Sequence, residues 1–537
     1  MYQGYLISNF NTGYHTTKEP WMAPRDAFIY MENAHCVDGI LQKRLGTTLL
    51  AQMKHDAAVQ TTTITGLHYH KSNDIHWLFA CDTARCNVYD EGTEAMVDIS
   101  GGSDIFTGLA SDLFWFLTFD GYTYLCNGED SPYKISGANC DIDGSYTIES
   151  FNTDLNDSGS RVMTSYKQLY HLNDRLLAYD IAENTTRKRY RLRYSQPLVR
   201  GNTPVFTDDY YLDVPTDDIP VTGRRLGRYI YLWHDESLWM IRPTGDTDLP
   251  FKPDLIRGDQ GSRSHHVCVP FEKGFLTVGN KDLIHFDGYE SRPLNLPNLN
   301  NVLALFEWDA IKYSWGVHDK HRKKIYITFA ASGSTYPDRI LEYSLTEKMF
   351  AVHAMNAHTM TMYPQFGGAP GWDDAPAAYG LDPATATLDD MPISGADYTF
   401  GLDYPTPVYG GRDGKLYRMF LGTDEAGSNY GFTAKTARFN PFTNKEQRVA
   451  LGRIAFLVDT SATASFTASL YKNTGDTAYK TQVITCTGSG DKHWESMHAG
   501  GEIGDFHRIG FSNTTKDNSP AIHAMWLEME PAGYLDP

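Results

Sequence analysis

IHWLFACD (75–82), followed by ARCNVYDEG (84–92), contains the pattern from which the fold of this chain can be predicted. The first segment alternates apolar and other residues, a short polar turn follows, and the second segment is built around a valine and a tyrosine. Alternation with a period of two residues on both sides of such a turn predicts a β-hairpin. One face of this hairpin is apolar and has to be covered by a neighbouring element.

The same pattern recurs along the chain. The further pairs are LFWFLTFD before GYTYLCNGED (113–130), the variant DRLLAYD before YRLRYSQP (174–197), YIYLWHD before ESLWMIRPTGD (229–246), GFLTVGN before KDLIHFDGYE (274–290), KIYITFAAS before RILEYSLTE (324–347) and PVYGGRD before GKLYRMFLG (407–422). Hairpins repeated every ~40 residues indicate a radial array of small antiparallel sheets, because each sheet must stack on the next. We therefore predict an all-β chain with a β-propeller of about seven blades.

Residues 1–60 do not contain the hairpin unit. Prolines keep this segment extended or turning, and its only helical-looking piece is RDAFIYMENA (25–34). A propeller is usually closed by strands from both ends of the array. We interpret 1–60 as an N-terminal arm and latch, and we expect the part around 40–60 to supply the closing strand.

The pattern also changes near residue 430. We assign 61–430 to the propeller, because the hairpins and their turns fill this range. Residues 431–537 contain five or more alternating strands, which predict a compact β-sandwich. We expect this sandwich to fold alone, with Phe456, Leu470, Phe511 and Trp526 inside.

Composition agrees with a large all-β protein. The chain has 537 residues, long enough for a large propeller and one smaller domain, and it contains 34 Tyr and 46 Gly. No stretch approaches the ~18 apolar residues of a membrane span, and the start lacks a basic segment followed by an apolar one. We expect a soluble protein made in the cytoplasm. The formal net charge of −19 argues against a broad basic surface for nucleic acid.

Cysteines and histidines give no sign of a metal centre or a cofactor. The seven cysteines include no C-x-x-C pair, so we expect reduced structural thiols, although Cys81 and Cys86 flank one turn and could meet. His68, His70 and His76 lie close together, but no third ligand in space or supporting partner is evident. We interpret them as surface or inter-blade histidines and predict no metal and no cofactor.

The sequence lacks the common catalytic motifs. There is no G-x-S-x-G, no H-E-x-x-H, no Walker loop and no G-x-G-x-x-G after a strand. The Asp-box of sialidase propellers is also absent. We therefore predict no catalytic residues and a protein that is not an enzyme.

One charge pattern does suggest a contact surface. In TRKRYRLRYS (186–195), strand geometry would place Arg187, Arg189, Arg191 and Arg193 on one face. Four guanidiniums on one face repel unless they meet carboxylates or phosphates. We consider an outer blade strand protected by charge, and alternatively a contact with an acidic neighbouring subunit or with the DNA backbone.

The N-terminal region resembles a known family. NFNTGYHTTKEPWMAPRDAFIYMENAHCVDGILQKRLGTTLL (9–50) is similar to the start of tail nozzle (tail tubular, tail stabilisation) proteins of short-tailed bacteriophages. The matching positions are Asn33, Ala34, Gly39, Leu41, Lys43, Arg44 and Gly46. Four later segments also look like this group: CNGEDSPYKISG (126–137), RYRLRYSQP (189–197), LIHFDGYESRP (283–293) and HAMWLEMEPAG (523–533).

The resemblance implies a non-enzymatic virion structural protein of the phage tail. Such a protein would form a ring-shaped homo-oligomer, a hexamer by family resemblance, that continues the DNA ejection channel below the portal. Its expected partners are the phage adaptor or connector protein, tail fibre or spike proteins, and passing genomic DNA without sequence recognition. No membrane span is expected.

Two other functions remain open. A carbohydrate-binding or carbohydrate-acting propeller, as in a receptor-binding or depolymerase-type tail protein, would use exposed aromatic residues as sugar platforms and a carboxylate pair at the central funnel. Trp372 and Trp494 are the candidate platforms. In the third hypothesis, an adhesin, the sandwich would recognise a host surface.

Overall fold

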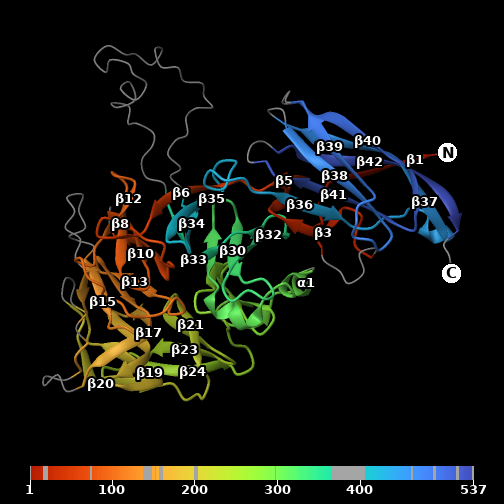
Figure 1. Ribbon diagram of the computed structural model, residues 1–537. Helices are drawn as coiled ribbons and strands as arrows, with labels where there is room; N and C mark the ends of the chain where they lie inside the picture. Colours follow the sequence, from red (N-terminus) through yellow and green to blue (C-terminus); the bar gives the residue numbers. More distant parts are fainter. Residues whose placement is uncertain are drawn as a thin grey trace, which may run out of the picture.

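The computed structural model describes residues 2–15, 22–72, 75–136, 148–151, 153–155, 161–198, 203–296, 298–364, 405–460, 464–487, 491–515 and 519–534. These residues form β-strands with very little helix, as predicted. They are arranged in two lobes, one made of small sheets and one made of two larger sheets, and both chain ends lie at the far end of the second lobe (Figure 1).

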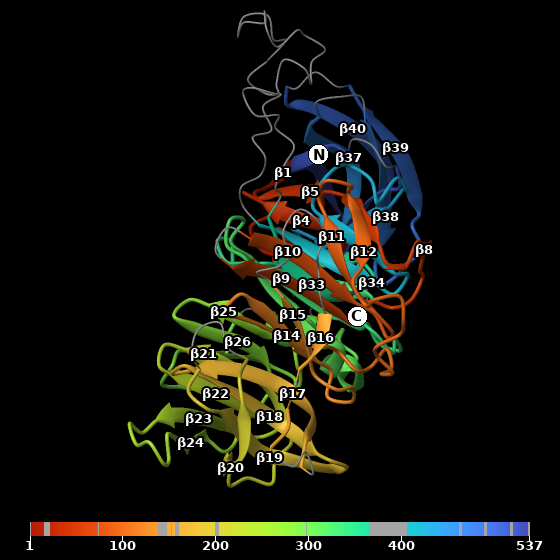
Figure 2. The ribbon, with the colours of Figure 1, turned by 90° about the vertical axis from the view of Figure 1, so that its left-hand side faces the viewer.

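The first lobe consists of seven four-stranded antiparallel sheets, or blades. Blades one and two are β9 (Gly66–Ser72), β10 (Ile75–Cys81), β11 (Cys86–Asp90), β12 (Ala95–Asp98), and β13 (Trp115–Phe119), β14 (Tyr122–Cys126), β15 (Tyr133–Ser136), β16 (Ile148–Ser150). Blades three and four are β17 (Met163–Leu172), β18 (Arg175–Glu183), β19 (Thr186–Ser195), β20 (Phe206–Asp213), and β21 (Pro220–Leu226), β22 (Tyr229–His234), β23 (Leu238–Pro243), β24 (Phe251–Arg257). In blades three and four the four strands follow one another in chain order across the sheet (Figure 2).

The remaining blades have the same order. Blades five and six are β25 (Cys268–Phe271), β26 (Gly274–Val278), β27 (Leu283–Phe286), β28 (Ser291–Pro293), and β29 (Gly316–Asp319), β30 (Lys324–Phe329), β31 (Arg339–Ser344), β32 (Phe350–Ala354). Two short helices, α1 (Leu299–Leu303) and η1 (Trp308–Tyr313), connect them. Blade seven is β33 (Ala357–Tyr363), β34 (Thr406–Gly411), β35 (Lys415–Met419) and β6 (Thr47–Gln52).

The blades close into a ring. The first strand of each blade contacts the first strand of the next, and β33 of blade seven contacts β9 of blade one. This is the arrangement of a seven-bladed β-propeller. Six of the seven hairpins read from the sequence are the two middle strands of a blade, and the hairpin at 113–130 is the first two strands of blade two.

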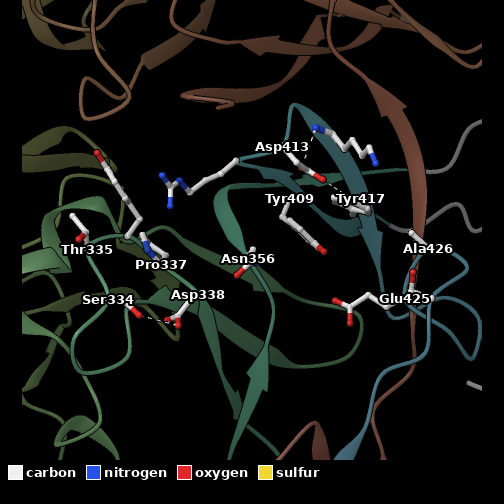
Figure 3. A pocket seen from close by; sticks show the side chains of 14 residues that line it. Ser334, Thr335, Pro337, Asp338, Asn356, Tyr409, Asp413, Tyr417, Glu425 and Ala426 are labelled. Atoms are coloured by element: carbon white, nitrogen blue, oxygen red, sulfur yellow. Dashed lines mark hydrogen bonds between the residues drawn. The ribbon is translucent and has the colours of Figure 1, made fainter. Parts of the chain in front are cut away.

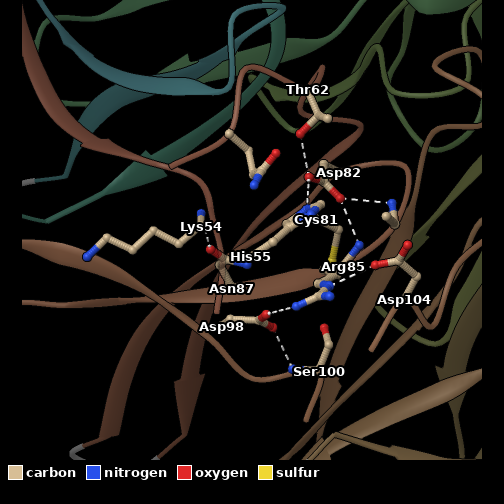
Figure 4. Close-up of polar contacts among 12 residues, drawn as sticks. Lys54, His55, Thr62, Cys81, Asp82, Arg85, Asn87, Asp98, Ser100 and Asp104 are labelled. Carbon is tan, nitrogen blue, oxygen red and sulfur yellow. Dashed lines mark hydrogen bonds and ion pairs between the residues drawn. The ribbon is translucent and has the colours of Figure 1, made fainter. Parts of the chain in front are cut away.

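The closing strand comes from the N-terminal region. β6 pairs antiparallel with β35, with Ala51 opposite Leu416. The chain then passes through β7 (Lys54–His55) and β8 (Ala58–Val59) into blade one. Polar contacts hold this passage: the Asp82 carboxylate lies 2.7 Å from His55 Nε2 and accepts a hydrogen bond from Thr62 Oγ1 (Figure 4). The first and last parts of the ring are thereby joined.

The second lobe is a sandwich of two sheets. One sheet has the order β4-β5-β42-β37-β40, with β1 also paired to β42, and the other has the order β2-β3-β36-β41-β38-β39. The N-terminal strands are β1 (Gln3–Ser8), β2 (Gly13–Tyr14), β3 (Ala27–Glu32), β4 (Ala34–Val37) and β5 (Ile40–Lys43). The C-terminal strands are β36 (Phe432–Thr436), β37 (Gln447–Asp459), β38 (Ala464–Lys472), β39 (Lys480–Cys486), β40 (His493–Gly504), β41 (His507–Asn513) and β42 (Ala521–Tyr534), and η3 (Thr443–Lys445) precedes β37.

The N-terminal segment therefore differs from the expected arm. β1 to β5 are strands of the sandwich, and only β6 belongs to the propeller. The piece at 25–34, which looked helical, contains strand β3, because pairing with β36 decides its conformation. Residues 431–537 thus make only part of the sandwich, since β36 and β42 pair with strands from the first 43 residues.

Trp526 also lies elsewhere than expected. Phe456, Leu470 and Phe511 are buried in the sandwich, but Trp526 is 40% exposed. Its neighbours in β42, Met525 and Leu527, take the inner face, so alternation puts the indole outside. The indole packs over Gly4 of β1, where a Cβ atom would lie 2.0 Å from the ring.

An apolar core continues from the sandwich into blades five and six. The family-like motif lies at this junction. Arg44 is 1% exposed, donates to Asn33 Oδ1 (3.0 Å), and its Nη2 lies 3.3 Å from a Glu425 carboxylate oxygen. Gly46 has no space for a side chain, because a Cβ atom would lie 1.9 Å from the carbonyl oxygen of Asp424. These residues fix the path from the sandwich to the propeller.

Among the described residues, no helix has the length and apolar character required to cross a membrane.

Candidate functional site: a polar pocket between blades six and seven

A cavity of about 710 Å³ opens between blades six and seven (Figure 3). Its wall comes from the β30–β31 loop, the β32–β33 connection, the β34–β35 hairpin and the segment that leaves blade seven for the sandwich. The side chains with polar or aromatic groups are Ser334, Thr335, Tyr336, Asp338, Asn356, Tyr409, Arg412, Asp413, Lys415, Tyr417, Glu425 and Ser428. Its volume is typical of small-molecule sites.

Two tyrosines from paired strands form an aromatic surface in this pocket. Tyr409 of β34 is buried, Tyr417 of β35 is half-buried, and their rings stack with centroids 5.0 Å apart. The Tyr417 hydroxyl donates to Asp413 Oδ2 at 2.6 Å. Burial, followed by the neighbouring Asp413 carboxylate, raises the pKa of Tyr417 well above its usual value. Burial does the same for Tyr409, so both phenols stay protonated at neutral pH.

The carboxylates around these rings differ in their partners. Asp338 stabilises its own loop, because its carboxylate accepts hydrogen bonds from the Ala331 amide (2.8 Å) and Ser334 Oγ (3.0 Å). Asp413 is exposed, and Glu425 is held from behind by Arg44. In Figure 3, Tyr409 lies between Asp413 and Glu425.

Side chains that can donate hydrogen bonds also line the pocket. The Arg412 guanidinium lies over the Tyr336 ring, 4.3 Å from its centroid, and Lys415 and Asn356 also line the wall. The pocket thus combines flat apolar rings with acceptors and donors that face a common space. A ligand with an apolar face and several hydroxyl groups fits this combination.

Three of the four arginines of the predicted stripe form ion pairs within their own blade. The ion pairs are Arg187–Asp180 (2.7 Å), Arg191–Asp213 (2.9 Å) and Arg193–Glu183 (2.7 Å). Arg193 is fully buried, and Arg189 is exposed with no ion pair to another described residue. Strand β19 is also the third strand of its blade, not the outer one. Three of the four side chains therefore stabilise blade three and are not free to contact a subunit or DNA.

The histidines and cysteines noted in the sequence have specific contacts in the propeller. His68 Nε2 lies 2.8 Å from Thr118 Oγ1, and His70 Nδ1 lies 2.6 Å from Thr123 Oγ1, so both connect blade one to blade two. The sulfurs of Cys81 and Cys86 approach to 3.1 Å across the β10–β11 hairpin.

The two candidate sugar platforms lie outside this pocket. Trp494, on β40 of the sandwich, is 49% exposed. Trp372 lies outside the described residues.

The central funnel does not contain the carboxylate pair expected for a carbohydrate-acting propeller. The axial cavity of about 740 Å³ is lined by the inner strands of all seven blades, and its described lining residues include no Asp or Glu. Carboxylates gather instead in the pocket between blades six and seven. In the sequence, GRDG (411–414) is recognisable only as a turn, because no local pattern pairs it with a loop more than 70 residues earlier.

No protein-family model and no curated protein matches this chain. Solved structures do match it. An exo-β-1,3-galactanase from Phanerochaete chrysosporium with galactose has 10% identity and a TM-score of 0.26 over 90% of this chain and 100% of that chain. PorZ, a surface component of the type-IX secretion system of Porphyromonas gingivalis, has 12% identity and a TM-score of 0.31 over 62% and 40%. A further glycoside hydrolase has 9% identity and a TM-score of 0.25 over 87% and 98%.

This comparison corrects the expected function. The main prediction is a non-enzymatic nozzle of a phage tail, whereas the matching structures named above include glycoside hydrolases, one of them with bound galactose. The predictions of a tail nozzle and of a protein without enzymatic activity are therefore not retained. With such low identities and TM-scores, the likeness assigns no activity to this chain.

Proposed function

We propose that this protein is a carbohydrate-binding or carbohydrate-acting β-propeller that takes a saccharide into the pocket between blades six and seven. The observation that carries the proposal is the stacked pair Tyr409–Tyr417 directly beside the Asp413 carboxylate. Aromatic faces and planar polar groups occur together there, on strands that the blade holds rigidly.

The physical basis is the shape of a sugar ring. One face of a pyranose carries mainly C–H groups, which pack favourably on an aromatic ring, while its edge carries hydroxyls. Asp413 and Glu425 can accept hydrogen bonds from these hydroxyls, and Arg412, Lys415 and Asn356 can donate to them. Hydrogen bonds to charged groups contribute more than neutral ones, so they set the orientation of the bound sugar.

Binding can be tested by screening the purified chain against an array of neutral and acidic oligosaccharides and measuring affinities by calorimetry. We expect Tyr417→Ala to weaken binding of the selected glycan by at least tenfold, because the sugar loses its aromatic platform. The matched control is Tyr289→Ala, which removes a tyrosine that is 92% exposed on another blade. Binding that is equal in both variants, or absent from the whole array, contradicts the proposal.

A carbohydrate-acting function is favoured by the carboxylates of the same pocket. Glycoside hydrolysis uses two carboxyl groups on either side of the scissile bond, and Asp413 and Glu425 both line the cavity. If the chain releases reducing ends from the glycan that it binds, we expect Asp413→Asn to lower the rate at least 100-fold. Glu236→Gln, at an exposed site on blade four, should leave the rate unchanged. Tight binding without product indicates a binding protein.

The phage-tail resemblance of residues 33–46 stays a prediction, as does the virion location that it implies. A receptor-binding or depolymerase-type tail protein would satisfy both the resemblance and the pocket. It would also be expected to assemble with copies of itself and with other tail proteins. Native mass spectrometry of the purified chain, alone and with tail partners, decides whether it forms a homo-oligomer.

A further inference from the structure

The axial cavity of the propeller has an unusual distribution of charge. Every blade starts with its inner strand and repeats the same antiparallel course, so the ends of the inner strands meet at one mouth of the cavity. Arg224 and Arg225 at the end of β21, and Lys320 just after β29, belong to its lining. Among the described residues that line the cavity there is no carboxylate, although the chain has 66 Asp and Glu and a net charge of −19.

Arg224, Arg225 and Lys320 are all exposed, and none of them forms an ion pair with another described residue. Arg224 Nη1 donates to the carbonyl of Cys268 (2.5 Å), and Arg225 Nη1 lies 3.1 Å from His171 Nδ1. These contacts to blades five and three hold both guanidiniums at the mouth while most of their donors stay available.

The wall beyond the mouth is aromatic. Trp115, Phe116 and Tyr170 line one part of the cavity, and Trp315 lines another. The His266 ring stacks on Trp315 with centroids 3.9 Å apart and an interplanar angle of 4°. A flat apolar body can therefore lie against this aromatic lining while a charged end remains at the mouth.

We propose that the axial cavity binds a small organic anion: its carboxylate or phosphate is held by Arg224, Arg225 and Lys320, and its flat apolar body lies against the aromatic wall. A cavity whose charged groups are all of one sign concentrates ligands of the opposite sign. Guanidinium groups match the planar geometry of a carboxylate and also bind phosphate with two hydrogen bonds. This site is separate from the proposed saccharide pocket, so either proposal can fail without the other.

The test uses two anionic probes and their neutral counterparts with the full-length protein. Benzoate is compared with benzamide, and phenyl phosphate with phenol, by calorimetry and by the fluorescence of the tryptophans in the wall. We expect each anion to bind at least tenfold more tightly than its neutral counterpart and more weakly as salt is raised. The probe that binds better shows whether the natural anion is a carboxylate or a phosphate.

Variants locate the binding. The triple variant Arg224→Gln, Arg225→Gln, Lys320→Gln should weaken binding of the preferred anion at least tenfold. Arg228→Gln, an exposed arginine after the same strand but outside the cavity lining, should not change it. Thermal melts and circular dichroism confirm that the variants are folded. Equal affinity for charged and neutral probes, equal loss in the control, or no binding at millimolar anion overturns the proposal.

Discussion

Arg44 connects the sandwich to the propeller through its contacts. It is buried, it donates to Asn33, and its charge is matched by a carboxylate of the saccharide pocket, Glu425. Lys43 and Arg44 also lie over the Tyr430 ring, at 3.8 and 4.2 Å from its centroid. The same residue thus connects the sandwich, the propeller and one wall of the candidate site.

We predict that Arg44→Met lowers the free energy of unfolding by about 3 kcal/mol, because it removes one of the two donors to Asn33 Oδ1 and the ion-pair partner of Glu425. Urea denaturation followed by tryptophan fluorescence measures the change. Arg189→Met, at an exposed arginine of β19, is the control and should change stability by no more than about 0.5 kcal/mol. A similar small effect at both positions would show that the junction does not depend on the buried guanidinium.

Among the elements, strand β6 closes the ring of blades. It consists of six residues, and it pairs the start of the chain with β35, the third strand of blade seven. Without it, blade seven would have three strands, and the apolar cluster that Ala51 shares with blade one would be open.

A charge placed in this strand tests the closure. We expect Ala51→Asp to lower stability by about 3 kcal/mol or more, because Ala51 is 6% exposed in an apolar cluster and the new carboxylate has no partner there. Hydrogen exchange of the β35 amides should become faster. Leu49→Asp, on the same strand but 50% exposed, is the matched control. Unchanged exchange in β35 after Ala51→Asp would mean that the ring does not need this latch.

At the scale of the whole molecule, buried histidines couple stability to pH. Burial lowers the pKa of His70, His234, His353 and His358 to about 4 in each case. In the unfolded chain a histidine takes a proton near pH 6.5. The folded state keeps these rings neutral, so the stability they contribute is complete above pH 6.5 and is lost as the pH falls toward 4.

We predict that the free energy of unfolding falls steeply between pH 6.5 and 4.5, by about 1.4 kcal/mol per pH unit for each such histidine. Urea midpoints at several pH values give the slope. His234→Gln should reduce this slope by the contribution of one histidine. The control His498→Gln, at an exposed ring on β40, should leave the slope unchanged. A flat profile across this range would contradict the prediction.

The sequence by itself determined the all-β class, the hairpins of the propeller and the latch around 40–60, because alternation and turn chemistry act over a few residues. Only the tertiary structure decided that β1 to β5 belong to the sandwich, that Trp526 faces outward, and that most of the arginine stripe is paired within blade three. The candidate pocket is of the second kind. Asp413 and Tyr417 share one hairpin, but Ser334 to Asp338 and Glu425 reach them only when blade six packs on blade seven, and local patterns do not encode such distant contacts.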